Sequence, residues 1–270
     1  MSLKTLIDTI KNTGEEVAYL AEYSPDILRG FYYQWKKHVS STRHRSMEDI
    51  VKEVKEKTGH DSFNIIGHSF GGLAGLVYTM ENPEKVKHYL AIGTPFKGTP
   101  LAYLAFVLLN IGVIPKAAMQ MIPDCDFIQA VGRYFSRHNH EFEKRGIVFE
   151  NIRSSNDEFV PFRYSSLKEL CPEARNITEY TMSGKGHVTI AHNEHVYRHI
   201  AGIIADSKVP TIFIPGFGLN GGFFERVLKG VKEAYPGLIS DDKMSRIFHL
   251  EYDYTKPINA DKIMADYDSD

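Results

Sequence analysis

The sequence predicts an α/β fold: a mostly parallel β-sheet with helices on both faces. Short apolar and β-branched runs alternate along the chain with longer segments of helical periodicity, and this alternation is typical of such sheets. Because parallel strands are buried on both faces, they read as nearly continuous apolar runs. Helices are expected at residues 3–22 and 47–57, and the clearest strand runs are residues 63–66, 88–92, 147–152 and 177–182.

The composition excludes two classes of protein. Of the 270 residues, 43% are apolar and 24% are charged, which supplies enough apolar material for a core and excludes disorder as the main state. The 32 Lys and Arg residues nearly balance the 34 Asp and Glu residues, so the formal net charge is -2. A nucleic-acid-binding surface needs a basic excess, and we therefore expect no nucleic-acid partner.

Location and thiol chemistry follow from three local features. Charged residues interrupt the N-terminus before any apolar run develops, so no signal peptide is visible and a cytoplasmic location is favoured. The longest apolar stretch, residues 101–115, is shorter than the roughly 20 residues of a membrane span, so we expect no integral span. Cys125 and Cys171 lack metal-ligand spacing, and we expect them to be buried free thiols.

A candidate nucleophile directly follows the first strand. Residues 67–71 (GHSFG) match the pattern G-x-S-x-G between a buried strand and a helix of small and apolar residues. This pattern places a serine on a strained strand-to-helix turn, where glycines allow close backbone approach and the helix N-terminus favours developing negative charge. Ser69 is therefore the candidate nucleophile. The alternative is a glycine-rich turn in a non-catalytic sheet.

Two segments resemble the α/β-hydrolase family, in particular its lipases and esterases. Residues 63–75 (FNIIGHSFGGLAG) are similar to the family's nucleophile elbow, and residues 91–101 (AIGTPFKGTPL) are similar to the stretch that follows the next strand in lipases. The resemblance implies a serine, a carboxylate and a histidine in that chain order. It also implies chemistry that needs neither a cofactor nor a metal.

The resemblance extends to an acid and a histidine. Residues 152–161 (IRSSNDEFVP) resemble the family's acid turn and point to Asp157, with Glu158 as the neighbouring alternative. His187 stands in a glycine-rich loop between a strand and a helix, which resembles the position of the family's catalytic histidine. Asp157 would then orient the imidazole of His187, which would take the proton of Ser69.

Four other histidines could be structural residues or metal ligands. His68 lies inside the elbow, and we expect it to be a structural neighbour. His192, His195 and His199 are spaced by three and then four residues, which would put them on one helix face within reach of a shared ion. The H-E-x-x-H order is absent, and histidines on an exposed helix face show the same spacing. We therefore expect no metal.

An oxyanion element stands near the C-terminus. Residues 210–218 (PTIFIPGFG) form an apolar strand that runs into a glycine turn, and helix 222–235 and strand 247–252 follow. The turn resembles the family's oxyanion loop, with Pro215 where a histidine is more usual. The resemblance implies two backbone N–H donors to the oxyanion, one from the residue after the nucleophile and one from this turn. These donors would be Phe70 and Phe217.

The position of this element predicts a circular permutation. In the family the oxyanion strand precedes the nucleophile, whereas here it follows the histidine. We therefore predict one α/β-hydrolase domain over residues 1–270, in which a segment of about 209–253 completes the first sheet. Permutation is tolerated where termini are exposed and close. The alternative is that residues 209–270 begin a truncated second domain.

The same turn formally matches a dinucleotide fingerprint. Gly216, Gly218 and Gly221 have the spacing G-x-G-x-x-G after a strand and before a helix. In that motif a carboxylate follows about 20 residues later. Here the nearest ones, Glu251 and Asp253, come about thirty residues later, so we expect no NAD.

A cap is expected between the second and third strands. Residues 101–122 are apolar and lie where the family carries its cap, and we expect an insertion over about 100–145. An apolar cap favours acyl chains or other apolar esters and offers a surface for lipid contact. A plain core helix would show the same pattern. Met119 and Met121 fit both a pocket wall and a core.

The sequence thus predicts a serine hydrolase that cleaves carboxylic esters, similar to lipases and esterases, with a small apolar ester as its substrate. Fold does not fix substrate. A thioesterase, a peptidase or an acyltransferase on the same three residues therefore stays open, as does a non-catalytic ligand-binding protein that keeps the pocket.

Overall fold

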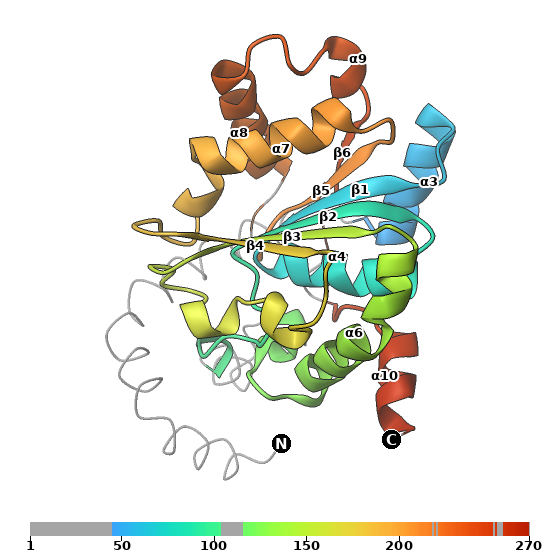
Figure 1. Cartoon of the computed structure of the whole chain (residues 1–270), viewed down its shortest axis with the longest axis vertical. Helices are drawn as coiled ribbons and strands as arrows, with labels where there is room; N and C mark the ends of the chain where they lie inside the picture. The colour runs from blue at the N-terminus through green and yellow to red at the C-terminus, as the bar shows by residue number, and fades with distance from the viewer. Residues whose placement is uncertain are drawn as a thin grey trace.

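One parallel β-sheet organises the described part of the molecule (Figure 1). The computed structural model describes residues 45–103, 116–217, 219, 221–250, 252 and 256–269. Six strands pair in the order β4-β3-β2-β1-β5-β6, and all five pairings are parallel. The strands are β1 (Phe63–His68), β2 (Val86–Ile92), β3 (Val148–Ser154), β4 (Ile177–Met182), β5 (Thr211–Ile214) and β6 (Ile247–His249).

Helices cover both faces of this sheet, as the sequence predicts (Figure 1). Adjacent residues of a strand point to opposite faces, so Ile65 packs into one core and Ile66 into the other. The first face carries α3 (Met47–Thr58), α4 (Phe70–Glu81), α6 (Asp126–Lys144) and α10 (Asp261–Asp268). The second carries α7 (Glu194–Asp206) and α8 (Gly221–Ala234), and α9 (Asp241–Met244) lies beside them. Short 3-10 helices are η1 (Lys116–Met121), η2 (Phe162–Tyr164), η3 (Lys168–Leu170) and η4 (Thr189–Ala191).

The helix before the first strand shows how local sequence sets an element. The Ser46 side chain accepts the N–H of Asp49, and the Asp49 side chain accepts the N–H of Ser46, which forms a capping box. Gly59 ends the helix in the left-handed region, at φ 73°. The predicted helix 47–57 is confirmed. The predicted helix 3–22 lies outside the described residues.

The C-terminal segment joins the same sheet. Strand β5 pairs in parallel with β1, with Ile214 beside Gly67, and β6 continues the sheet beyond β5. All four residues of β5 are buried, because β5 lies between two strands and under helices on both faces. The circular permutation itself stays a prediction.

The predicted cap of residues 100–145 needs a correction in its second half. Helix α6 packs on the sheet: Phe135 and Phe149 of β3 meet edge to face, with ring centroids 5.2 Å apart. Its buried residues Phe127, Val131, Phe135 and Phe142 follow a helical stripe, so this helix belongs to the layer on the first face. Residues 104–115 lie outside the described residues.

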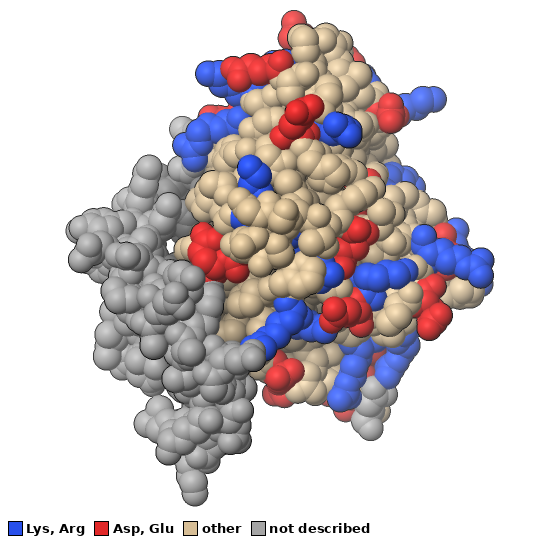
Figure 2. Space-filling model, turned by 60° about the vertical axis from the view of Figure 1, so that its left-hand side comes forward, with Lys and Arg blue, Asp and Glu red and all other residues tan. Residues whose placement is uncertain are grey.

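Three further observations concern the described surface and thiols. Basic and acidic side chains are interspersed on the face that Figure 2 shows. Within the described ranges, no helix is long and apolar enough to cross a bilayer. Both cysteines are free: Cys171 is buried, as expected, whereas Cys125 is only partly buried.

Candidate active site

The elbow at residues 67–71 has the strained geometry that its sequence predicts. Ser69 lies between β1 and α4 with φ 55° and ψ -128°, a conformation that a residue with a side chain rarely adopts. A Cβ atom on Gly71 would lie 2.2 Å from Ile214 O, and one on Gly67 would lie 2.5 Å from Gly72 Cα. Both glycines are therefore needed for close backbone contact, and Ser69 does not use its side chain as a helix cap.

The structure brings Ser69, His187 and Asp157 together. His187 Nε2 lies 2.8 Å from Ser69 Oγ, and His187 Nδ1 lies 2.8 Å from Asp157 Oδ2 and 3.0 Å from its Oδ1. All three side chains are buried. With the proton on Nδ1, the imidazole donates to Asp157, and Nε2 accepts from the Ser69 hydroxyl. This relay is the arrangement that nucleophilic catalysis by serine requires.

Sheet topology explains why residues distant in sequence meet here. Ser69 follows β1, Asp157 follows β3 and His187 follows β4, and the carboxyl ends of parallel strands lie at one edge of the sheet. Asp157 Oδ1 also accepts the backbone N–H groups of Phe159 (2.9 Å) and Val160 (2.7 Å). These bonds fix the carboxylate before it meets the imidazole.

Glu158, the alternative acid, has a different partner. Its Oε2 accepts the backbone N–H of His187 at 2.9 Å, whereas the imidazole bonds to Asp157. The next residue, Phe159, stacks its ring on the imidazole of His187, with centroids 5.1 Å apart and planes 23° from parallel. The sequence contains no signal for these two contacts except their position beside Asp157.

His68 contacts the same loop from the opposite side. Its Nε2 donates to His187 O at 2.8 Å, and its ring is fully buried. Burial, reinforced by the neighbouring His187, lowers the pKa of His68 well below its ordinary value, so the ring is neutral. His68 is therefore a buried neighbour of the site, as the sequence predicts, with a specific bond that the sequence does not reveal.

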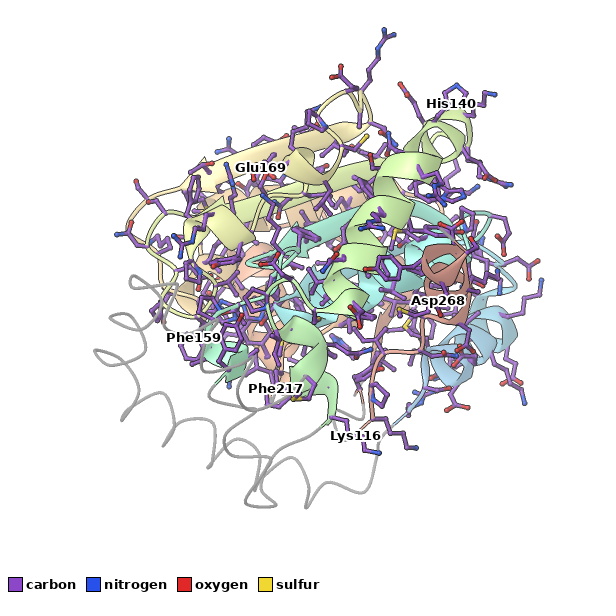
Figure 3. The ribbon with its side chains drawn as sticks, turned by 90° about the horizontal axis from the view of Figure 1, so that it is seen from below. Lys116, His140, Phe159, Glu169, Phe217 and Asp268 are labelled. Carbon is purple, nitrogen blue, oxygen red and sulfur yellow. The ribbon has the colours of Figure 1, made fainter. Side chains whose placement is uncertain are left out.

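A cavity of about 150 Å³ opens at Ser69. Its described lining contains no Lys, Arg, Asp or Glu. Met121 lines it and is also part of the core on the first face, whereas Met119 packs against that core and is not in the described lining. Phe159 and Phe217, which both line the cavity, lie at one end of the molecule, and His140 and Asp268 lie at the other (Figure 3). The described lining is His68, Ser69, Pro95, Thr99, Leu101, Met121, Phe159, Val160, His187, Val188, Gly216, Phe217 and Leu219.

The turn after β5 packs directly on the elbow. A Cβ atom on Gly216 would lie 2.8 Å from both Ser69 Cβ and His68 Nδ1, so a glycine is required for this approach. Phe217 follows it and lines the cavity, and Phe70 is the first residue of α4, with its ring edge-on to that of Phe217 at 6.4 Å. Gly218 lies outside the described residues, as do Glu251 and Asp253 of the dinucleotide fingerprint.

The three spaced histidines do not gather around one point. His192 lies before α7, where it packs edge-on to Phe223, so the prediction that it shares a helix face with His195 and His199 is wrong. His199 Nδ1 lies 2.6 Å from Glu150 Oε2, and the ring of His195 contacts that of His199. The described residues contain no group of three His, Cys, Asp or Glu side chains placed to hold a metal ion.

Comparisons with solved structures give distant similarities. A monoacylglycerol lipase from Paleococcus ferrophilus is 22% identical, with 53% of this chain and 68% of that chain covered, at a TM-score of 0.34. A carboxylesterase from Nitrososphaera gargenis is 18% identical (62% and 75% covered, TM-score 0.37), and carboxylesterase CesB from Bacillus subtilis is 13% identical (62% and 69%, TM-score 0.40). Similarities this low carry no information about the substrate.

A family model supplies the comparison that bears on the fold. No curated protein matches the chain. The model described as the alpha/beta hydrolase fold matches residues 24–113, a segment that contains the elbow between β1 and α4. The parallel sheet with helices on both faces agrees with that match. The matched segment and the parallel sheet together show the α/β-hydrolase fold.

Proposed function

We propose that this protein is a serine hydrolase that cleaves carboxylic esters. One observation carries the proposal: the Ser69 hydroxyl, the His187 imidazole and the Asp157 carboxylate form a continuous hydrogen-bonded relay with no contact longer than 3.0 Å. The relay lies beside an uncharged cavity. A nucleophile bonded to a base, which is itself bonded to an orienting acid, is the requirement for acyl transfer.

The proposed first half of the reaction forms an acyl-enzyme. Ser69 Oγ attacks the ester carbonyl carbon while His187 Nε2 takes the hydroxyl proton, and the carbonyl π electrons move to its oxygen. Backbone N–H groups of Phe70 and Phe217 donate to this oxyanion. When the carbon–oxygen bond to the alcohol breaks, the alkoxide takes the proton from Nε2 and leaves. Asp157 holds the imidazole and stabilises its charged form throughout.

The second half repeats these steps with water as the nucleophile. His187 Nε2 removes a proton from water as its oxygen attacks the acyl carbon. The intermediate then expels Ser69 Oγ, which recovers its proton from His187, and the carboxylic acid leaves. No step requires a cofactor or a metal.

The cavity lining supports an apolar, uncharged acyl group as the substrate. Leu101, Met121, Val160 and Leu219 provide apolar walls, and the described lining offers no charged side chain to pair with a charged acyl group. Burying an unpaired charge is strongly unfavourable, whereas each buried methylene stabilises binding by about 0.8 kcal/mol.

We also infer that the chain is a circularly permuted member of the α/β-hydrolase superfamily. The pairing of β5 with β1 and the approach of Gly216 to Ser69 support this inference, because an oxyanion turn must lie beside the nucleophile. In the permuted reading, residues of about 209–253 complete the first sheet instead of starting another domain. We propose further that the first half of the expected cap, residues 100–125, contacts a lipid surface.

An active-site probe tests the function. A fluorophosphonate should label the wild type and the Ser245→Ala control, whose serine is exposed on the surface, but not Ser69→Ala. The wild type and Ser245→Ala should also hydrolyse p-nitrophenyl esters, whereas Ser69→Ala should not. Failure of the wild type to label and to hydrolyse would overturn the proposal in favour of a ligand-binding protein.

A substrate panel separates the remaining activities. Oxygen esters, thioesters and anilides of the same acyl group should be compared, with and without an alcohol acceptor. We expect the oxygen ester to be cleaved fastest. A higher kcat/KM for the thioester or the anilide, or transfer to the alcohol in preference to water, would instead identify a thioesterase, a peptidase or an acyltransferase.

A further inference from the structure

The main chain of His187 is held from both sides. Its N–H donates to Glu158 Oε2 at 2.9 Å, and its C=O accepts from His68 Nε2 at 2.8 Å. The two ring nitrogens bond to Asp157 and Ser69. Every polar group of His187 therefore has a side-chain partner, and each partner is Ser69 or Asp157 or the residue next to one of them in sequence.

The acid turn provides three different contacts to His187. Asp157 meets the imidazole edge, Phe159 stacks on the ring face, and Glu158 accepts the backbone N–H. The residue before His187 is adapted to the last contact, because a Cβ atom on Gly186 would lie 2.7 Å from Glu158 Oε2. Glycine at this position therefore leaves room for the carboxylate.

Burial of the His68 ring costs more folding free energy than its one hydrogen bond contributes. The ring is fully buried, and its Nδ1 has no hydrogen-bond partner in the described part of the chain. A buried polar atom without a partner costs more free energy than an ordinary hydrogen bond contributes. The bond from Nε2 to His187 O thus needs an explanation other than fold stability.

The loop that carries His187 needs such support. Residues 183–188 lie between β4 and η4 and contain no helix or strand. A Cβ atom on Gly184 would meet nothing within 4 Å, so this residue is held by the hydrogen bond from its N–H to Asn156 Oδ1, at 2.7 Å, and not by side-chain packing. The proposed reaction needs His187 Nε2 to stay within hydrogen-bond distance of Ser69 while the proton moves.

We propose that Glu158 and His68 are positioning residues that hold the main chain of His187, so that its imidazole stays aligned between Ser69 and Asp157. The proposal rests on the proposed function. A displacement of about 1 Å in such an arrangement lowers the rate about 100-fold. Glu158 is not among the described residues that line the cavity, so its loss should change kcat and leave KM nearly unchanged.

The first test replaces Glu158. In Glu158→Ala we expect kcat for a p-nitrophenyl ester to fall about 30- to 100-fold with KM within about threefold. Glu158→Gln keeps an oxygen acceptor and should stay within about fivefold of the wild type. Glu141→Ala is the matched control, because Glu141 pairs with Arg145 on the surface of α6. Glu158→Ala with more than a third of the wild-type kcat would overturn the proposal, as would equal impairment of the Gln and Ala variants.

The second test replaces His68. A glutamine places an N–H donor near the position of Nε2, whereas a leucine cannot donate to His187 O. We expect His68→Gln to retain at least tenfold more kcat than His68→Leu, with thermal midpoints of the two variants alike. Equal activity of the two variants would overturn the role of His68.

A spectroscopic readout separates this proposal from the proposed function. If the wild type neither labels with fluorophosphonate nor hydrolyses esters, the function fails. The proton NMR resonance of His187 Nδ1–H still reports its bond to Asp157. It should be present in the wild type and Glu158→Gln and broadened or lost in Glu158→Ala. An unchanged resonance in Glu158→Ala would overturn the positioning role whatever the activity.

Discussion

Gly71→Ala should destabilise the protein sharply, because Gly71 lies where α4 touches the turn after β5. Its added Cβ atom would lie 2.2 Å from Ile214 O and 2.3 Å from Pro215 O, whereas ordinary van der Waals contact begins near 3.4 Å. Both clashing atoms belong to the backbone and cannot rotate away. The helix and the strand must therefore separate by about 1 Å, which is overpacking of the kind that costs about 1–3 kcal/mol.

A matched control reverses the sign of the effect. Gly202 lies inside α7, and a Cβ atom there would meet nothing within 4 Å. Because glycine destabilises a helix interior by roughly 0.5–1 kcal/mol relative to alanine, Gly202→Ala should stabilise the protein by about that amount. The same substitution thus gives opposite results at two glycines.

Thermal and urea unfolding followed by circular dichroism measure the difference. A loss of about 3 kcal/mol in Gly71→Ala lowers the midpoint by about 6–12 °C, whereas Gly202→Ala raises it by about 1–4 °C. Below the unfolding transition, Gly71→Ala should also lose activity, because Phe70 and Phe217 move apart and the loss of one oxyanion donor lowers kcat about 10²- to 10³-fold. A Gly71→Ala variant as stable as Gly202→Ala would refute the packing of residues 211–217 on the elbow, and with it the permuted reading.

Two further predictions concern substrate length and pH. The cavity of about 150 Å³ is the size that holds benzene. We therefore expect kcat/KM for p-nitrophenyl esters to rise about fourfold per methylene up to acyl groups of about six carbons and then to fall. A flat profile up to twelve carbons would contradict this expectation. Burial raises the pKa of Glu150, but hydrogen bonds from His199 and His88 outweigh burial and lower it to about 2, below its unfolded value. The native state thus binds fewer protons, so stability present above about pH 4.5 should be lost as pH falls toward 2. Urea unfolding should show a smaller loss in Glu150→Gln than in the wild type or the exposed control Glu233→Gln, and equal losses would count against the shift.

Local patterns in the sequence were enough to predict much of the fold. Strand β4 covers the predicted residues 177–182, whose sequence ITEYTM is rich in the β-branched and aromatic residues that favour strands. Ser69 was predicted as the nucleophile because its pattern places a glycine two residues to either side. In the structure, both Gly67 and Gly71 make backbone contacts too close for a side chain. The end of β6 at His249, three residues before the predicted end of that strand, shows how weak such patterns are at boundaries.

Tertiary contacts set the limits of sequence prediction. The apolar stripe of α6, which includes Phe135, has the same residue spacing in a cap helix as in a helix that packs on the sheet. Only the contact with Phe149 of β3 decides between the two placements. The hydrogen bonds that link Glu158 and His68 with His187 join residues 29 and 119 positions apart. No local pattern encodes these bonds, so the sequence pointed to Asp157 as the candidate acid but not to the contacts that hold the main chain of His187.

The meeting of Ser69, Asp157 and His187 at one sheet edge also makes activity a measure of folding. Ser69 and His187 are 118 residues apart, and β2, β3 and β4 intervene. Contacts of such long sequence separation slow folding, since loop-closure entropy is lost before they form. A peptide with the elbow alone lacks its base. During refolding, hydrolysis should therefore return only after the four strands β1 to β4 have paired, later than the helical circular dichroism signal.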